Sequence, residues 1–249
     1  MAITTRIWFE EPVEGNDFAP EKSFLFGRDF FSGLAEKHSF IALVYLHITG
    51  RIPSPEQEKL LGFLLNLSAN PGIRDESTLV AMNTAIGSAP LVNSVLAGLM
   101  ARSGLNRGSL WVERVMENLH LAKRGEISLK DCSQFSGLGK HYDHIDKRAV
   151  AARCFLKANG CWGETCCFLE SHESEDNWLL LEGVIAAGFL DLGISPAAGS
   201  ILFLMSVCPA LAAFSLEQQE QGYKMFPHYF EPGHYSFPSI PIEKNEMEQ

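Results

Sequence analysis

One acidic side chain occupies a position at which the sequence could support proton transfer. Glu182 is the only charged residue in the apolar stretch 178–187, which has helical character. Burial disfavours the charged form of a carboxylate, raises its pKa and makes it a competent base at neutral pH. Glu182 is therefore a candidate general base. The alternative is a structural ion pair or a cap at a helix face.

Basic side chains gather shortly before that acid. Arg148 is the best candidate for binding an anion, because a planar guanidinium makes paired hydrogen bonds to a carboxylate. Its alternative role is a structural ion pair with Asp143 or Asp146. Lys140 and His141 begin the sequence KHYDH. Either could polarise a carbonyl group, although Lys140 could equally be a solvated loop lysine.

The six cysteines do not have the spacing of a metal site. Cys161, Cys166 and Cys167 lie close together, but structural zinc sites use pairs in CxxC spacing. The first residues, MAITTRIWFEEP, lack the basic and apolar regions of a secretory signal peptide. We therefore expect a cytoplasmic protein with reduced thiols, no metal and no permanently bound cofactor. The six are Cys132, Cys154, Cys161, Cys166, Cys167 and Cys208.

Length and composition indicate a single large globular domain with a small appendage at most. The chain has 249 residues, of which 46% are hydrophobic and 20% charged. That composition excludes disordered, collagen-like and coiled-coil proteins. Thirty acidic residues against twenty basic ones give a net charge of −10. Because binding to a phosphate backbone depends on positive charge, nucleic acid is not an expected partner.

Helix signals recur along the chain, whereas strand signals are weak. Apolar residues recur at three- and four-residue spacing, and proline, serine and glycine stand at the expected ends. These patterns predict an all-α, multi-helix protein, and Gly193 is expected to end the last helix of the series. Residues 217–249 are polar, aromatic and proline-rich and are predicted to form a mostly extended tail. The predicted helices cover 53–67, 78–86, 90–102, 111–123, 148–158 and 177–192.

The stretch 194–216 carries no formal charge and has two interpretations. Its length would allow it to cross a bilayer. Against a membrane span, Pro196 stands at the start, where proline commonly begins a helix of a soluble protein, and Pro209 interrupts the stretch. The flanking residues are also acidic rather than basic. The favoured prediction is a helix buried on all sides in a large helical core, with no membrane association.

A series of short motifs in a fixed order resembles one known family. The motifs are FGRD at 26–29, SF at 39–40, YLHITGRIP at 45–53, NPG at 70–72 with ST at 77–78, LNRGS at 105–109, GLG at 137–139 with DKR at 146–148, EGVIAA at 182–187, and LF at 202–203 through EQ at 217–218. With these motifs, residues 24–230 resemble short proteins of the citrate synthase family, in particular the citryl-CoA lyase-like group and the C-terminal module of ATP-citrate lyase.

The resemblance implies a fold and a chemistry. The expected fold is all-α and citrate synthase-like, with an N-terminal extension over 1–23, a large helical domain over 24–230 that includes a small helical subdomain at about 104–176, and a C-terminal tail over 231–249. Family members are usually homodimers that bind coenzyme A (CoA) thioesters and form or break a carbon–carbon bond with a keto acid. A homodimer, or a hetero-oligomer with an active homologue, is therefore expected.

Carried over position by position, the family's catalytic histidines are replaced. The histidine that holds the substrate falls on Pro71, the one that stabilises the enol on Asn106, and the one that polarises the carbonyl on Lys140. A shift by one residue would return His141 to that last position. The loss of both oxyanion donors should slow acetyl-CoA enolisation or abolish it.

The family's catalytic aspartate and its substrate-binding arginines can be compared with this chain in the same way. The family's aspartate falls on Glu182, and one substrate arginine is retained as Arg148. Another arginine falls on Val207, which predicts a substrate that lacks the corresponding carboxylate, or no such substrate.

The residues present suggest an enzyme that acts on a CoA thioester but not on citrate itself. In this hypothesis Glu182 is the base, Asn106 the enol donor, Lys140 or His141 the carbonyl polariser and Arg148 the carboxylate anchor. Arg107 could contact a CoA phosphate, although a surface arginine is the simpler role. For Asn106 the simpler role is that of a turn residue. The alternative hypothesis is a catalytically inactive homologue that binds a metabolite or another subunit.

Overall fold

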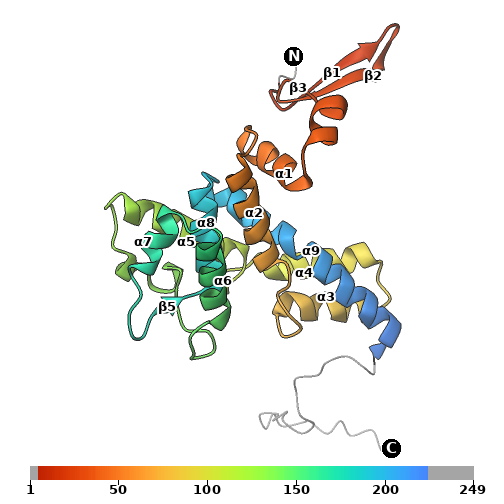
Figure 1. Ribbon diagram of the computed structural model, residues 1–249. Helices are drawn as coiled ribbons and strands as arrows, with labels where there is room; N and C mark the ends of the chain where they lie inside the picture. Colours follow the sequence, from red (N-terminus) through yellow and green to blue (C-terminus); the bar gives the residue numbers. More distant parts are fainter. Residues whose placement is uncertain (1–4, 224–249) are drawn as a thin grey trace, which may run out of the picture.

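The computed structural model describes residues 5–223, and helices make up most of it (Figure 1). The all-α prediction is confirmed. The helices are α1 (Phe40–Thr49), α2 (Pro55–Ser68), α3 (Glu76–Ile86), α4 (Leu91–Arg102), α5 (Ser109–Lys123), α6 (Lys147–Ala158), α7 (Glu164–Glu170), α8 (Leu181–Asp191) and α9 (Pro196–Gln221), with a π-helical turn η1 (Phe30–Ala35) and a 3-10 segment η2 (Leu129–Phe135). The short strands are β1 (Trp8–Val13), β2 (Asn16–Leu25), β3 (Arg28–Asp29), β4 (Leu138–Gly139) and β5 (Trp178–Leu179).

Local capping explains why α2 begins where the sequence predicts. The Ser54 hydroxyl accepts a hydrogen bond from the backbone N–H of Gln57 at 3.2 Å, and the Gln57 side chain accepts one from the Ser54 N–H at 3.0 Å. Pro55 occupies the first helical position, where its missing N–H is no loss. Reciprocal caps of this kind satisfy two N–H groups that the helix itself leaves unpaired.

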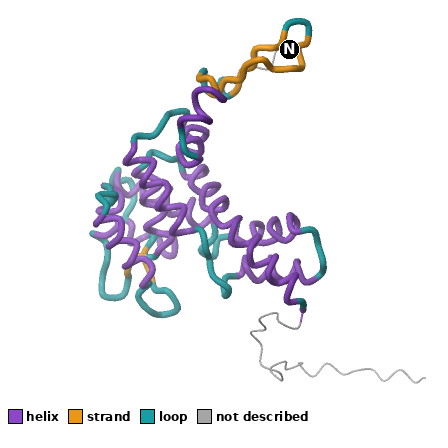
Figure 2. Tube along the Cα trace, turned by 45° about the vertical axis from the view of Figure 1, so that its right-hand side comes forward, coloured by secondary structure: helices purple, strands orange, loops and turns teal. Residues whose placement is uncertain are grey.

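A small antiparallel sheet at the N-terminus was not predicted. Strand β1 pairs with β2, and β2 pairs with β3, so residues 8–29 form a three-stranded sheet that projects beyond the helices (Figure 2). The turn between β1 and β2 contains Gly15 with a φ of 78°, a conformation that glycine adopts without strain. Leu25 of β2 packs with Leu34 and Leu46, and this contact joins the sheet to α1.

The helix predicted over 177–192 begins later than expected. Trp178–Leu179 is strand β5, which pairs with β4, and α8 starts at Leu181. The end of the helix was predicted correctly, since Gly193 follows it with a φ of 71°. An apolar run cannot by itself separate a short buried strand from the helix that follows it.

Helix α9 packs against α3, α4 and α5, but it is not buried on all sides. Leu202, Phe203 and Val207 are buried, whereas Ile201 is 60% exposed. The helix continues through Pro209 and extends to Gln221, so the first five residues of the predicted tail are helical. Residues 224–249, including the predicted tail 231–249, lie outside the described part of the chain. Within residues 5–223, α9 is the helix long and apolar enough to cross a membrane, with a mean hydropathy of 2.0 in its most apolar window, of which 33% is buried.

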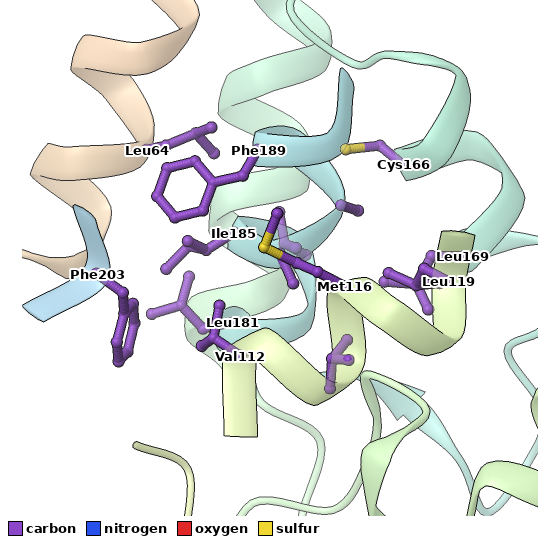
Figure 3. Close-up of a cluster of buried hydrophobic side chains, with 14 of the residues drawn as sticks. Leu64, Val112, Met116, Leu119, Cys166, Leu169, Leu181, Ile185, Phe189 and Phe203 are labelled. Atoms are coloured by element: carbon purple, nitrogen blue, oxygen red, sulfur yellow. The ribbon is translucent and has the colours of Figure 1, made fainter. Parts of the chain in front are cut away.

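The core is centred on α8, whose residues from Leu181 to Phe189 are all buried. Figure 3 shows Ile185 and Phe189 of α8 among Leu64 of α2 and Met116 of α5. These residues belong to one continuous apolar cluster that also includes Phe203 of α9. Residues of the predicted small subdomain, about 104–176, contribute to this same cluster, and the subdomain boundary stays a prediction.

Two glycines allow the start of α8 to approach strand β4. A Cβ atom on Gly183 would lie 2.1 Å from the carbonyl oxygen of Gly137, well inside van der Waals contact. The Leu180 N–H also donates to the Gly137 carbonyl at 3.2 Å. The residue before Gly183 is Glu182, so this close backbone contact decides where the candidate base lies.

We predict that Gly183→Ala destabilises the protein. Overpacking lowers the free energy of unfolding by about 1–3 kcal/mol. The new Cβ would meet backbone atoms of Gly137, and this clash is relieved only if α8 shifts. Gly62→Ala is the matched control, because Gly62 lies in α2 and a Cβ there meets no atom within 4 Å. The control should be neutral or more stable by about 0.5–1 kcal/mol. Urea unfolding of both variants measures the difference, and equal stability of the two would contradict the packing argument.

Candidate active site

A cleft of about 700 Å³ brings together most of the residues singled out from the sequence. Its volume is in the range of small-molecule sites. Its lining includes residues 71–76, before and at the start of α3, and Arg102 at the end of α4. The other lining residues are Asn106, Arg107, His141, Tyr142, Arg148 and Glu182.

Glu182 lies in the first turn of α8 and is 4% exposed. Its Oε1 accepts a hydrogen bond from Arg148 Nη2 at 3.3 Å. Its Oε2 is buried and has no hydrogen-bond partner among the described residues. A buried carboxylate oxygen without a partner is costly, and such groups are found where a ligand supplies the missing contact. The prediction that Glu182 is buried is confirmed, and the predicted structural ion pair is present as well.

Arg148 is held from behind by Asp146. Its Nε and Nη2 each donate to Asp146 at 2.9 Å, and Asp146 also accepts from the backbone N–H groups of Arg148 and Leu181, at 3.0 and 3.1 Å. Asp146 is 1% exposed. Burial alone would raise the pKa of Asp146, but these hydrogen bonds and the Arg148 charge outweigh it and lower the pKa. The predicted pair between Arg148 and Asp146 is therefore confirmed.

His141 lies between two guanidinium groups. Arg107 Nη1 donates to its Nδ1, and Arg148 Nη2 approaches the same atom at 3.4 Å. A guanidinium has only donors, so Nδ1 must accept and the proton of a neutral imidazole must be on Nε2. Burial, followed by the positive charge of Arg148 and then of Arg107, lowers the pKa of His141 despite the nearby Asp146 and Glu182. His141 is thus a neutral ring whose Nε2–H has no acceptor among the described residues.

A tight turn sets the position of His141. The backbone groups of His141 and His144 exchange hydrogen bonds at 2.8 and 3.1 Å. Tyr142 and Asp143 between them have φ angles of 49° and 62°, which are uncommon for residues other than glycine and asparagine. Tyr142 lines the cleft, whereas His144 is exposed and does not.

Lys140 does not line this cleft. Its Nζ forms an ion pair with Asp176 at 2.9 Å and lies 5.6 Å from the centre of the Trp178 ring. It lines a neighbouring pocket of about 380 Å³ that also contacts Asn106 and Arg107. The structure therefore separates Lys140 from Glu182, and His141 is the basic residue of KHYDH that shares the cleft with it.

The loop before α5 is compact because of a glycine. A Cβ on Gly108 would lie 2.3 Å from the Arg102 carbonyl oxygen, so only glycine fits. Asn106 is exposed and makes no hydrogen bond within residues 5–223. Arg107, with a φ of 54°, turns toward the cleft and also donates to the Lys140 carbonyl at 2.6 Å. Of these two neighbours, Arg107 makes the contacts inside the cleft.

Sequence reasoning missed the cleft residues Asp75 and Arg102. Arg102 and Asp75 form an ion pair between residues 27 positions apart, which no local pattern reveals. Arg74 and Glu76 flank Asp75 directly after the NPG motif, and this run of charges was the signal available. Val207, by contrast, is fully buried against Ala81 and Leu211 and does not line the cleft.

The described residues contain no cluster of three or more histidine, cysteine or acidic side chains that could hold a metal ion. All six cysteines are unpaired. The cleft chemistry visible in this part of the chain is therefore that of carboxylates, guanidinium groups and one imidazole.

The sequence matches no protein-family model and no curated protein, but the fold matches solved structures. Over 98% of its length the chain is similar to citryl-CoA lyase from Hydrogenobacter thermophilus, with a TM-score of 0.78, 20% identity and 97% of that chain covered. ATP citrate lyase from Methanosaeta concilii in complex with (3S)-citryl-CoA gives a TM-score of 0.73 at 16% identity, over 96% of this chain and 42% of that one. Citrate synthase from Pyrobaculum aerophilum gives a TM-score of 0.54 at 22% identity, over 82% of this chain and 55% of that one. The chain therefore has a citrate synthase-like fold.

We predict that the pKa of His141 lies below its ordinary value and rises when either arginine is removed. Arg148→Gln should raise it more than Arg107→Gln, because the Arg148 charge lowers it more. NMR titration of the ring measures the pKa, and nitrogen shifts report the Nε2–H tautomer. Lys140→Gln is the control and should leave the pKa unchanged, since Lys140 is paired with Asp176. A His141 protonated at neutral pH would refute this arrangement.

Proposed function

We propose that this chain is a divergent member of the citrate synthase family that acts on a CoA thioester. The proposed reaction forms or breaks a carbon–carbon bond between the thioester and a keto acid, and citrate itself is not the substrate. The observation that carries the proposal is the meeting of Glu182 and His141, a buried carboxylate and a neutral donor, in one cleft. A proton acceptor and a proton donor side by side are what such chemistry requires.

Each group has a definite role in the proposed reaction. Glu182 removes a proton from the carbon next to the thioester, and its Oε2 is available for this because no described residue donates to it. The resulting enol carbon attacks the carbonyl carbon of the keto acid. His141 Nε2–H polarises that carbonyl and supplies the proton that its oxygen takes up. Arg148 holds a carboxylate through Nη1, which has no partner among the described residues.

The cleft differs from one built for acetyl-CoA and citrate. Pro71 lines it where the resemblance places a histidine, and proline has neither a side-chain donor nor a backbone N–H. Asn106 is exposed, and enol stabilisation by its amide stays a prediction, as does a contact of Arg107 with a CoA phosphate. Loss of one oxyanion donor typically costs about 3 kcal/mol of transition-state stabilisation. A different acyl group or a more readily enolised thioester fits this site better.

One observation favours an inactive homologue as the second candidate. Arg148 already pairs with Glu182, so the candidate base is engaged in a structural ion pair. Lys140, the other group proposed to polarise the carbonyl, is engaged by Asp176 in the neighbouring pocket. In this alternative the cleft binds a metabolite without transforming it, or the chain serves as a subunit of an active relative.

The remaining expectations belong to the same proposal. CoA enters as a substrate, no cofactor is permanently bound, and the protein works in the cytoplasm away from membranes and nucleic acid. The proposed partner is a second copy of the chain or an active homologue. Apolar side chains on α4 and α9 support this, since Leu96, Met100, Ile201 and Leu216 are 52%, 78%, 60% and 48% exposed.

We predict that the protein exchanges the α-protons of a CoA thioester with deuterated water. Proton NMR follows the exchange for a series of acyl-CoA compounds, with and without a keto acid. Glu182→Gln should slow exchange by about 10²- to 10⁴-fold, because the amide cannot accept the proton. Glu170→Gln is the matched control, since Glu170 lies outside the cleft and pairs with Arg153 and Lys157.

Calorimetric titration with CoA and acetyl-CoA distinguishes the two candidates. Saturable binding together with exchange supports the enzyme, and saturable binding without exchange supports the inactive homologue. In either case Arg148→Ala should reduce the heat released when a keto acid is added. Absence of thioester binding at millimolar concentration would refute the enzyme and leave the inactive homologue, as a sensor of another metabolite or as a subunit of an active relative.

We predict a dimer in sedimentation analysis. The double variant Leu96→Glu, Ile201→Glu should sediment as a monomer, because buried unpaired carboxylates oppose association. Phe18→Glu is the control, since Phe18 is 98% exposed on the N-terminal sheet, far in sequence from α4 and α9. A wild-type monomer that associates only with an active homologue would indicate the hetero-oligomer instead.

A further inference from the structure

We infer that the pocket beside the cleft receives the apolar part of the acyl group, and that the substrate therefore carries an acyl chain longer than acetyl. This inference rests on the proposed function and specifies its thioester. The side pocket, lined in part by Leu105, Leu138 and Leu180, has a volume of about 380 Å³. That volume is at the lower end of the range for ligand sites, so it suits part of a ligand rather than a whole coenzyme.

The side pocket and the cleft meet at one pair of residues. Asn106 and Arg107 line both cavities. Arg107 forms hydrogen bonds on both sides of this border, to the His141 ring in the cleft and to the Lys140 carbonyl at 2.6 Å. A chain that leaves the cleft here passes along the Arg107 side chain, whose methylene groups offer apolar contact. One ligand can therefore extend from the cleft into the side pocket.

Apolar side chains form the floor of the side pocket. Trp111, Leu138 and Leu180 line it and are 3%, 5% and 4% exposed, so the protein core holds them in place. Leu105 lines the same pocket and is 48% exposed, which adds accessible apolar surface. A hydrocarbon chain laid against this surface removes apolar area from water, and its binding is favoured for that reason.

The polar groups around this floor already have partners. The Trp111 Nε1–H donates to the Gln134 carbonyl at 2.9 Å, and Lys140 Nζ pairs with Asp176 at 2.9 Å. Among residues 5–223, none of the buried side-chain atoms that lack a hydrogen-bond partner belongs to a residue of the side pocket. A carboxylate placed there would lose its water without gaining a waiting partner. The occupant that fits is a hydrocarbon.

The floor is fixed relative to the candidate base. Leu180 lies two residues before Glu182, and its N–H donates to the Gly137 carbonyl at 3.2 Å. Leu138 follows Gly137 and pairs with Leu179 between β4 and β5. The acyl chain extends from the same carbon whose proton Glu182 removes in the proposed reaction. Chain length should therefore affect proton exchange as well as binding.

The test is a series of thioesters that differ only in the acyl group. Calorimetry with the full chain compares CoA, acetyl-CoA, butanoyl-CoA and succinyl-CoA, which carries a carboxylate where butanoyl-CoA has its methyl group. Each buried methylene should raise the affinity about fourfold, so butanoyl-CoA should bind about 10- to 20-fold more tightly than acetyl-CoA. Succinyl-CoA should bind more weakly than butanoyl-CoA. Exchange of α-protons in deuterated water should show the same preference for butanoyl-CoA over acetyl-CoA.

One substitution at the exposed edge of the pocket locates the chain. Leu105→Gln should reduce the ratio of butanoyl-CoA to acetyl-CoA affinity and leave the affinity for CoA itself unchanged. Ile52→Gln is the matched control, because Ile52 is a 38% exposed aliphatic residue that lines neither cavity. The control should leave the ratio as it is in the wild-type protein.

The outcomes separate this inference from the proposed function. Equal affinity for acetyl-CoA and butanoyl-CoA, a preference for succinyl-CoA, or a ratio that Leu105→Gln leaves unchanged would overturn the inference. Weaker binding of CoA itself to Leu105→Gln would also overturn it, because the pantetheine arm would then occupy the side pocket. In each of these cases acetyl-CoA still binds and the proposed function stands. Absence of saturable heat with every thioester would instead refute the enzyme, and this inference with it.

Discussion

The buried carboxylate of Asp146 joins the two segments that carry the cleft's chemistry. It accepts from the N–H of Arg148 at the start of α6 and from the N–H of Leu181 at the start of α8, and it holds the Arg148 guanidinium by two atoms. A buried charge is stable only when it is paired and its hydrogen bonds are satisfied, and breaking such a pair costs about 3–5 kcal/mol. The position of Arg148 next to Glu182 and His141 depends on this arrangement.

Charge, rather than shape, determines what the groups in the cleft can do. Burial and then the charges of Arg148 and Arg107 lower the pKa of His141, and the two guanidinium groups settle which nitrogen carries its proton, so the ring is a donor in a cationic surrounding. The same Arg148 donates to Glu182 Oε1 and leaves Oε2 without a partner among the described residues. A carboxylate oxygen that can accept a proton and an imidazole N–H that can donate one are thereby held in one cavity.

The sequence allowed the helices and part of the cleft to be predicted, for identifiable reasons. Ser54 with Gln57, and the glycine after α8, are local signals whose meaning depends on a few neighbouring residues. Glu182 stands out because a lone acid in an apolar helix is unusual. The pair of Arg102 and Asp75 could not be found in this way, since only the packing of α3 against α4 brings them together. Likewise, the separation of Lys140 from the cleft depends on Asp176, which has no pattern linking it to Lys140.

Close backbone packing constrains a few positions of this fold. Gly137 and Gly183 lie where backbones touch, and Gly108 lies where the loop before α5 folds back on α4, so no other residue fits there. Other groups serve packing and chemistry together. Asp146 accepts from the backbone at the starts of α6 and α8 and also holds the guanidinium of Arg148. Glu182 Oε2, by contrast, has no partner among the described residues. The reaction therefore has to be inferred from the groups that the cleft brings together.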